Sequence, residues 1–234
     1  MARVKIRRKD LRRPDEFLEF TGRAWDWVVD HRSAVMTVAA AVVVLAGIIT
    51  GIRQYENHRG RVAAEAFRKA TALLAAGEAD AAADAFGAVP RVGSYGALSD
   101  LYRGHAALQA ANAPAAARAF RAAAGAAEIP TYLRQEALYS LAVALDMQGD
   151  APGALAAYEE AGNLPGPFRV DARLAAARLS HAAGASDRAR VLYELALSDA
   201  QDAGPPQDDL REVANWRLTT LFSKKPEAKI APVE

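Results

Sequence analysis

"QGDAPGALAAYEEA", residues 148–161, is the stretch of this chain that decides its fold. Gly149 is a small residue that can take the tight turn at which one helix ends, and a second helix follows it. Ala154 lies five residues after the glycine and lets two helix backbones approach closely. Tyr158 fills the gap one turn later, and Ala161 admits the next element. The stretch therefore predicts a pair of antiparallel helices.

The same pattern recurs along the rest of the chain. Four turn positions lie 34, 38 and 35 residues apart, at Gly77, Ala111, Gly149 and Gly184. Five, nine and twelve residues after each turn come an alanine, an aromatic residue and a small or short apolar residue. The four sets are Ala82, Phe86, Val89; Ala116, Phe120, Ala123; Ala154, Tyr158, Ala161; and Ala189, Tyr193, Ala196. A repeat of this length predicts an all-α stack in which neighbouring units bury one another's apolar faces.

These four units resemble the tetratricopeptide repeat, whose unit is 34 residues long. The resemblance covers about residues 61–200 and implies an α-solenoid of four helix pairs. The first helices depart from the family, because its early large aromatic residue is replaced in every unit. The residues at that position are Ala66, Asp100, Leu138 and Arg173.

One long apolar stretch lies near the N-terminus, "AVMTVAAAVVVLAGIITGI", residues 34–52. Nineteen residues without a charge, at about 1.5 Å each, approach the roughly 30 Å thickness of the hydrocarbon core of a membrane. The only polar side chains are those of Thr37 and Thr50, whose hydroxyls can bond back to helix carbonyls. The stretch therefore predicts a single transmembrane helix.

A cleaved signal peptide is the alternative interpretation of this stretch. Such a signal has a short basic start, an apolar run of about 7–15 residues and a small-residue cleavage site. Here 33 residues with acids and tryptophans come first, and "RRPDEFL", residues 12–18, resembles a twin-arginine signal only faintly. The long, partly acidic segment before the apolar run favours the anchor.

The distribution of basic residues predicts how the span is oriented. Residues 1–33 carry nine Lys or Arg against six Asp or Glu, and seven of the nine lie within the first thirteen positions. Counted only within about 20 residues of the span, the order is reversed, with two basic residues before it and five after it. A short tail counts in full under the positive-inside rule, so we expect the N-terminus inside and the C-terminus outside.

Residues 13–32, "RPDEFLEFTGRAWDWVVDHR", predict an amphipathic helix before the span. Pro14 suits a first helical turn, and the two acids after it favour a helix N-terminus. Beside a polar stripe runs an apolar face with the aromatic residues Phe17, Phe20, Trp25 and Trp27. We expect an interfacial helix with its tryptophans at the level of the lipid headgroups. A docking helix for another membrane protein is the alternative.

The stretch "GPPQDDLREVANWRLTTLF", residues 204–222, predicts one more helix after the fourth unit. Stacked repeats leave an apolar end that a terminal helix covers, so we expect Trp216 to be a capping residue. Lys, Pro and Ala dominate the last twelve residues, which predicts a disordered tail. The predicted organisation is a basic arm with an interfacial helix, a transmembrane helix, a repeat domain with its capping helix, and a tail, over residues 1–33, 34–52, 53–222 and 223–234.

The first helix of each unit is expected to line a concave surface, as in other helical repeats. Positions at fixed distances before each turn place a largely apolar wall there, with a polar end. The candidate partner-binding residues are Phe67, Leu98, Leu101, His105, Leu108, Tyr139, Val143, Met147, Leu174 and Arg178. Such a groove commonly binds a protein segment. The alternative is that the terminal helix or a neighbouring unit covers it.

Composition and motifs give no support to catalysis or metal binding. The chain has no cysteine, and no two of its four histidines lie three or four residues apart, so thiolate sites and paired helical histidines are excluded. HExxH and G-x-S-x-G motifs do not occur. The chain after the span carries twenty basic and twenty-two acidic residues, which gives no electrostatic footprint for nucleic acid. We expect no enzyme, no cofactor, no metal and no small-molecule substrate.

The "RPDEFLEF" and "RAWDWV" stretches, residues 13–20 and 23–28, together with one span and a degenerate repeat array, resemble a bacterial family. It is the family of ancillary subunits of the SecYEG translocon. The resemblance implies a non-catalytic scaffold in the inner membrane, with a cytoplasmic N-terminus and periplasmic repeats. It further implies association with the Sec translocon and with periplasmic chaperones or emerging chains. An assembly factor or structural subunit of another envelope complex is the alternative, because it would use the same parts.

Overall fold

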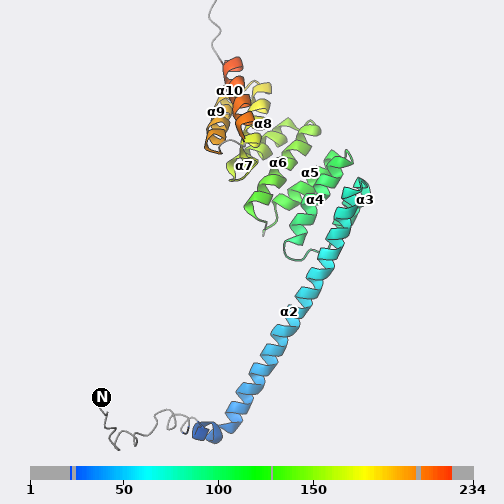
Figure 1. Ribbon diagram of the computed structural model, residues 1–234, viewed down its shortest axis with the longest axis vertical. Coiled ribbons are helices and arrows are strands. Elements are labelled where there is room, and N and C mark those ends of the chain that lie inside the picture. Colours follow the sequence, from blue (N-terminus) through cyan, green and yellow to red (C-terminus); the bar gives the residue numbers. More distant parts are fainter. Residues whose placement is uncertain (1–21, 23–24, 128, 204–206, 223–234) are drawn as a thin grey trace, which may run out of the picture. The chain divides into compact units, whose positions relative to one another are not determined.

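The computed structural model describes residues 22, 25–127, 129–203 and 207–222 (Figure 1). Within these ranges the chain forms helices and no β-strand, which confirms the all-α class expected from the sequence. Alanine, the strongest helix former, is abundant throughout them. The chain divides into two compact units, Met1–His58 and Arg59–Glu234.

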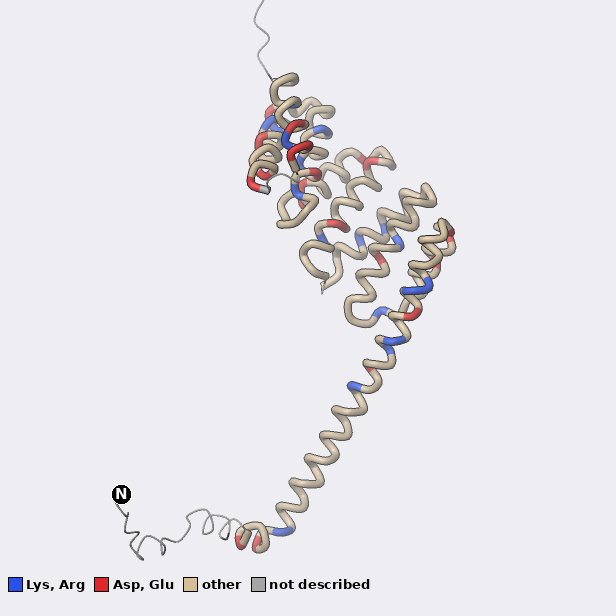
Figure 2. The backbone as a smooth tube through the Cα atoms, in the orientation of Figure 1, with Lys and Arg blue, Asp and Glu red and all other residues tan. Residues whose placement is uncertain are grey.

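Helix α2, Arg32–Ala75, contains the apolar stretch. Between Arg32 and Arg53 no residue is charged (Figure 2). The hydroxyls of Thr37 and Thr50 donate to the carbonyls of Ser33 and Ala46, at 2.9 and 2.7 Å, so neither leaves an unsatisfied donor. Among the described residues, α2 is the one helix long and apolar enough to cross a membrane, and none of its most apolar window is buried within the protein. A core helix of a soluble protein would be mostly buried instead. The helix continues past residue 52, so the predicted span and the first repeat helix belong to one helix.

Residues 25–30, ahead of α2, are helical and end in a turn at His31. Trp25 and Trp27 are 69% and 58% exposed within the protein. The ring of Trp27 stacks on that of His31, with 4.8 Å between the ring centroids. Phe17 and Phe20 of the predicted interfacial helix lie outside the described residues, as does the predicted tail, 223–234.

The second unit consists of helices that follow one another along the chain, each packed against the next (Figure 1). After the end of α2 they are α3 (Ala79–Gly87), α4 (Tyr95–Gln109), α5 (Ala113–Ala124), α6 (Thr131–Met147), α7 (Ala151–Asn163), α8 (Arg169–Ala182), α9 (Ser186–Ala203) and α10 (Asp208–Phe222). Short turns join α2 to α3, α4 to α5, α6 to α7, and α8 to α9. Each of these turns contains one of the four turn residues expected from the sequence.

All four turn residues adopt the left-handed conformation. Their φ angles are +82° at Gly77, +57° at Ala111, +77° at Gly149 and +81° at Gly184. At each, the turn N–H donates to the carbonyl three residues back, and the next N–H donates to the carbonyl five residues before it. This is the Schellman pattern, which satisfies the last carbonyls of the first helix. Ala111 is the one non-glycine residue with positive φ in the described part of the chain.

The interior of the second unit repeats with the same register. The twelve alanine, aromatic and small apolar residues that follow the four turns are at most 4% exposed. Seven residues before each turn lies another buried small residue, and these are Ala70, Gly104, Ala142 and Ala177. A Cβ on Gly104 would lie 2.5 Å from the ring of Phe120, so only glycine leaves room for that ring. The fixed spacing brings a small residue of one helix against an aromatic residue of the next.

Helix α10 packs against α9 and α8 at the C-terminal end of the second unit. Leu218, Leu221 and Phe222 pack against an apolar cluster formed by Ala177, Ala189 and Tyr193. Trp216 is 55% exposed, so the expectation that it caps the array is wrong. It sits on the outer face of α10, and the last turn of that helix makes the covering contact.

Candidate partner-binding face

Most of the candidate residues lie on α4, α6 and α8. These are the first helices of the second, third and fourth helix pairs predicted from the sequence. Two polar pairs join these helices. His105 of α4 lies 3.2 Å from Glu136 of α6, between Nε2 and Oε1. Arg178 of α8 donates to Asp146 of α6, with 2.6 Å between Nη2 and Oδ2. The candidate residues His105 and Arg178 therefore both contact α6.

Aromatic contacts support the middle of this face. The ring of Tyr139 stacks on that of Phe168, just before α8, with centroids 5.2 Å apart. Its edge contacts Tyr158 of α7 at 5.5 Å. Burial, with the neighbouring Tyr139 and Asp146, raises the pKa of Tyr158 to about 12. Both rings therefore act as neutral packing groups at neutral pH.

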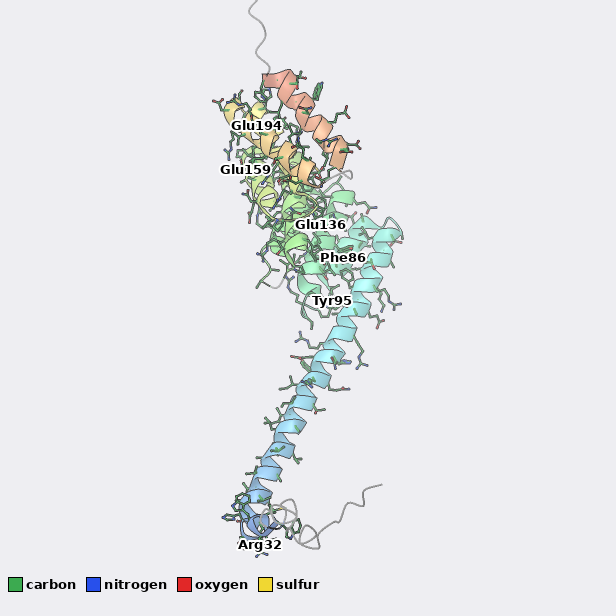
Figure 3. All side chains as sticks on the ribbon, turned by 60° about the vertical axis from the view of Figure 1, so that its left-hand side comes forward. Arg32, Phe86, Tyr95, Glu136, Glu159 and Glu194 are labelled. Atoms are coloured by element: carbon green, nitrogen blue, oxygen red, sulfur yellow. The ribbon has the colours of Figure 1, made fainter. Side chains whose placement is uncertain are left out.

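The N-terminal end of the face is an aromatic cluster around Phe67 of α2. Its ring lies 5.3 Å from Phe86, 5.9 Å from Tyr95 and 5.3 Å from Tyr102. Phe86 and Tyr95 come from different helices and converge beside α2 (Figure 3). Phe67 is half-buried, so it mainly joins α2 to α3 and α4.

The candidate residues differ in their exposure. Leu101 is 1% exposed and belongs to the core, so its side chain cannot reach a partner. Half-buried are Leu98, His105, Leu108, Tyr139, Val143 and Leu174. Met147 is 58% exposed, and the side chain of Arg178 is 56% exposed. The accessible part of the face is therefore centred on Met147 and Arg178.

Helix α10 covers part of the face at the fourth unit. Leu174 packs into the same apolar clusters as Leu210 and Phe222 of α10. The ring of Phe222 lies 5.9 Å from that of His181, near the end of α8. Helix α10 therefore covers the wall beside Leu174, as the alternative interpretation expected. Met147 remains exposed.

Gln135 of α6 is a structural residue that the sequence reasoning missed. It is 0% exposed, and its Nε2 donates to the carbonyls of Ala161 and Leu164, at 3.1 and 2.8 Å. Its Oε1 accepts from the backbone N–H of Phe168 at 3.2 Å. The amide therefore ties the end of α7 and the loop after it to α6. A signal existed, because the other three units have Ala63, Ala97 and Val170 at this position.

A second missed contact joins α8 to α9. Arg173 donates to Asp199, and both side chains are only 15% exposed. Arg173 stands where the repeat pattern expects a large aromatic residue. An ion pair therefore occupies a position that packing usually fills.

The described residues contain no cluster of three or more His, Asp or Glu that could hold a metal ion. His105 and Arg178 are paired with acidic side chains of α6. No protein-family model matches the chain, and no curated protein matches it either.

Proposed function

We propose that this chain is a non-catalytic scaffold, tethered to a membrane by residues 34–52 of α2, that binds protein partners with its helical repeats. The observation that carries the proposal is the repeated register. Four turns with positive φ, each followed at the same distances by buried residues, support a repeat array. Helical repeats characteristically present a long surface to other proteins.

The repeats are, in this proposal, a degenerate tetratricopeptide-like solenoid with α10 at its end. Three features support this. Each unit has a small residue seven positions before its turn and an alanine and an aromatic residue after it. Successive first helices contact one another through His105–Glu136 and Asp146–Arg178. Polar Gln135 and Arg173 stand in place of the apolar residues that such repeats usually bury, so the units are not interchangeable.

The partner-binding face is proposed to be the surface of α4, α6 and α8, with Met147 and Arg178 at its accessible part. A methionine adapts to different apolar side chains, and a surface arginine can pair with a carboxylate of the partner. Tyr139 and Val143 extend this surface along α6. A helix or extended segment with a few apolar anchors suits these dimensions.

The partner proposed is the bacterial Sec translocon, with periplasmic chaperones or emerging chains held on the repeats. The order of parts supports it: a basic arm, an aromatic helical segment, one span and a repeat array. The location proposed is the inner membrane, with the repeats in the periplasm. A structural subunit or assembly factor of another envelope complex has the same order of parts and is the alternative.

Photo-crosslinking in native membranes tests the proposal. A photoreactive amino acid replaces Met147 or Arg178 in the full chain, and a control replaces Ala156, which is exposed on α7. We expect Sec subunits or a chaperone to be crosslinked from the two face positions and not from the control. Crosslinks to a different envelope complex favour the alternative. Equal crosslinks from Ala156, or none from any position, contradict a scaffold that uses this face.

A further inference from the structure

Helix α10 presents two large apolar side chains to solvent. Val213 is 46% exposed and Trp216 is 55% exposed. They are three residues apart and lie on one side of the helix. Asp209 and Glu212 join them there, and the four side chains line one shallow hollow. We call these four residues the α10 outer face.

The α10 outer face does not hold the helix in the fold. Leu218, Leu221 and Phe222, which pack against the cluster of α8 and α9, project from the other side of α10. Ala214, also on that side, is 0% exposed. Exposed apolar side chains that contribute nothing to the core are a common mark of an interaction site.

The two charged residues of this face are both acidic. Asp209 and Glu212 form no ion pair within the described residues, whereas neighbouring Asp208 pairs with Arg211 at 2.9 Å. Figure 2 shows acidic positions gathered at the start of α10. The guanidinium of Arg217 lies 4.8 Å from the ring centroid of Trp216, so the ring already accepts a cation on one face.

We propose that the α10 outer face is a docking site for a basic amphipathic helix of a partner protein. Aliphatic side chains spaced three or four residues apart on that helix would pack on Val213 and Trp216. Lysine or arginine beside them would pair with Asp209 and Glu212. The last helix of a stack stands where a further helix would pack, so a helix is the shape that fits. This site is separate from the face of α4, α6 and α8 and does not depend on it.

Trp216 is a built-in reporter of docking. The chain has three tryptophans, so Trp25→Phe and Trp27→Phe leave Trp216 as the only one. This variant of the full chain is placed in phosphatidylcholine nanodiscs, and its emission is followed during titration with a synthetic peptide. The peptide contains only Lys and Leu, with Leu on one face of about five helical turns. The control peptide has Glu in place of Lys. We expect a saturable shift of emission to shorter wavelength with the Lys peptide and none with the Glu peptide.

Variants on the α10 outer face and a control variant elsewhere test whether the Lys peptide binds to this face. Asp209→Asn with Glu212→Gln should weaken binding of the Lys peptide about fivefold, because two exposed charge pairs are lost. Val213→Ser should weaken it as well. Glu78→Gln with Glu160→Gln removes two exposed acids elsewhere and should leave binding unchanged. Equal responses to both peptides, or unchanged binding by the Asp209/Glu212 variant, would overturn the proposal.

Two other occupants of the face are separated in the same experiment. If residues 223–234 cover it, their deletion alone moves Trp216 emission to longer wavelength. If a second copy covers it, emission depends on protein concentration without any peptide. Either result overturns the proposal of a partner helix. Emission that is unchanged by deletion and by dilution supports an open face.

Discussion

Arg178 of α8 and Asp146 of α6 join equivalent helices of two successive units, with 2.6 Å between Nη2 and Oδ2. Their side chains are 56% and 31% exposed. Arg173 and Asp199 form a second pair, in which both side chains are 15% exposed. Because solvent screens the first pair far more than the second, the two should differ in their contribution to stability.

The first prediction concerns these two pairs. A double-mutant cycle of Arg178→Ala and Asp146→Ala should give a coupling energy of about 0.2–1 kcal/mol. The cycle of Arg173→Ala and Asp199→Ala should give a larger value, because both side chains are far less exposed to screening by solvent, although Arg169 still lies 3.7 Å from Asp199. Thermal unfolding of the full chain in detergent, followed by circular dichroism, measures both. A stronger coupling for the exposed pair would contradict the burial argument.

The second prediction concerns Ala111, which adopts φ = +57°. An L-residue with a side chain is strained there, and glycine is not. Ala111→Gly should therefore stabilise the compact unit Arg59–Glu234 by about 0.5–1 kcal/mol, after the greater flexibility of the unfolded chain is subtracted. Ala110→Gly is the matched control, because Ala110 has φ = −78° and glycine there should destabilise. The same sign of change at both positions would mean that the turn conformation is misassigned.

The third prediction concerns the interior of α7. Ala154 is 0% exposed, and replacing it with leucine should overpack the core and cost about 1–3 kcal/mol. Ala156 lies two residues further on the same helix and is exposed, so Ala156→Leu should change stability little. Both variants keep the helix propensity high. Midpoints of thermal unfolding that fall equally in the two variants would show that the buried side of α7 is not the one described.

The fourth prediction concerns Gln135. Its replacement with leucine removes one of the two donors at each of the carbonyls of Ala161 and Leu164 and leaves the N–H of Phe168 without an acceptor. The loss should be about 1–3 kcal/mol, mainly from the unsatisfied N–H of Phe168. Gln109→Leu is the control, because Gln109 is exposed on α4. Hydrogen exchange at the N–H of Phe168 should also accelerate in the Gln135 variant. Unchanged exchange there would argue against the hydrogen bond.

The fifth prediction concerns the orientation of the span. The basic arm predicts that alkaline phosphatase fused after Glu234 is active in bacterial cells, because the enzyme folds only outside the cytoplasm. The same enzyme fused after Asp30 should be inactive. The reverse pattern would contradict both the positive-inside reading and the resemblance to the translocon subunits. Immunoblots of both fusions control for expression.

Features that depend only on residues close together in the chain can be predicted from the sequence. Gly77, Gly149 and Gly184 stand at turns because glycine adopts positive φ without strain, and the fixed offsets after them reflect the helical period. The apolar run in α2 can also be located in the sequence, because nineteen consecutive residues carry no charge and match the length of a membrane span. Even Ala111, a poor residue for such a turn, could be located because the units on either side set its register.

The exposure of a side chain and its hydrogen-bond partners depend instead on which distant residues of the chain pack against it. Leu101 and Met147 were both expected to lie on the partner-binding wall, yet one is 1% exposed and the other 58%. The apolar residues at the same position of the other repeat units mark Gln135 as unusual, but its hydrogen-bond partners lie 26 to 33 residues further along the chain and follow only from the structure.

Trp216 illustrates the difference between what the sequence determines and what the tertiary structure decides. The sequence by itself determined that a helix with a large aromatic residue follows the fourth unit, because an amphipathic period and a good helix start are local properties. Only the tertiary structure decided which side of α10 meets the array. Leu218, Leu221 and Phe222 fit the gap beside Tyr193, and this rotation of the helix leaves Trp216 outside. Periodicity places residues on a face, but burial depends on the shape of the surface that the face meets.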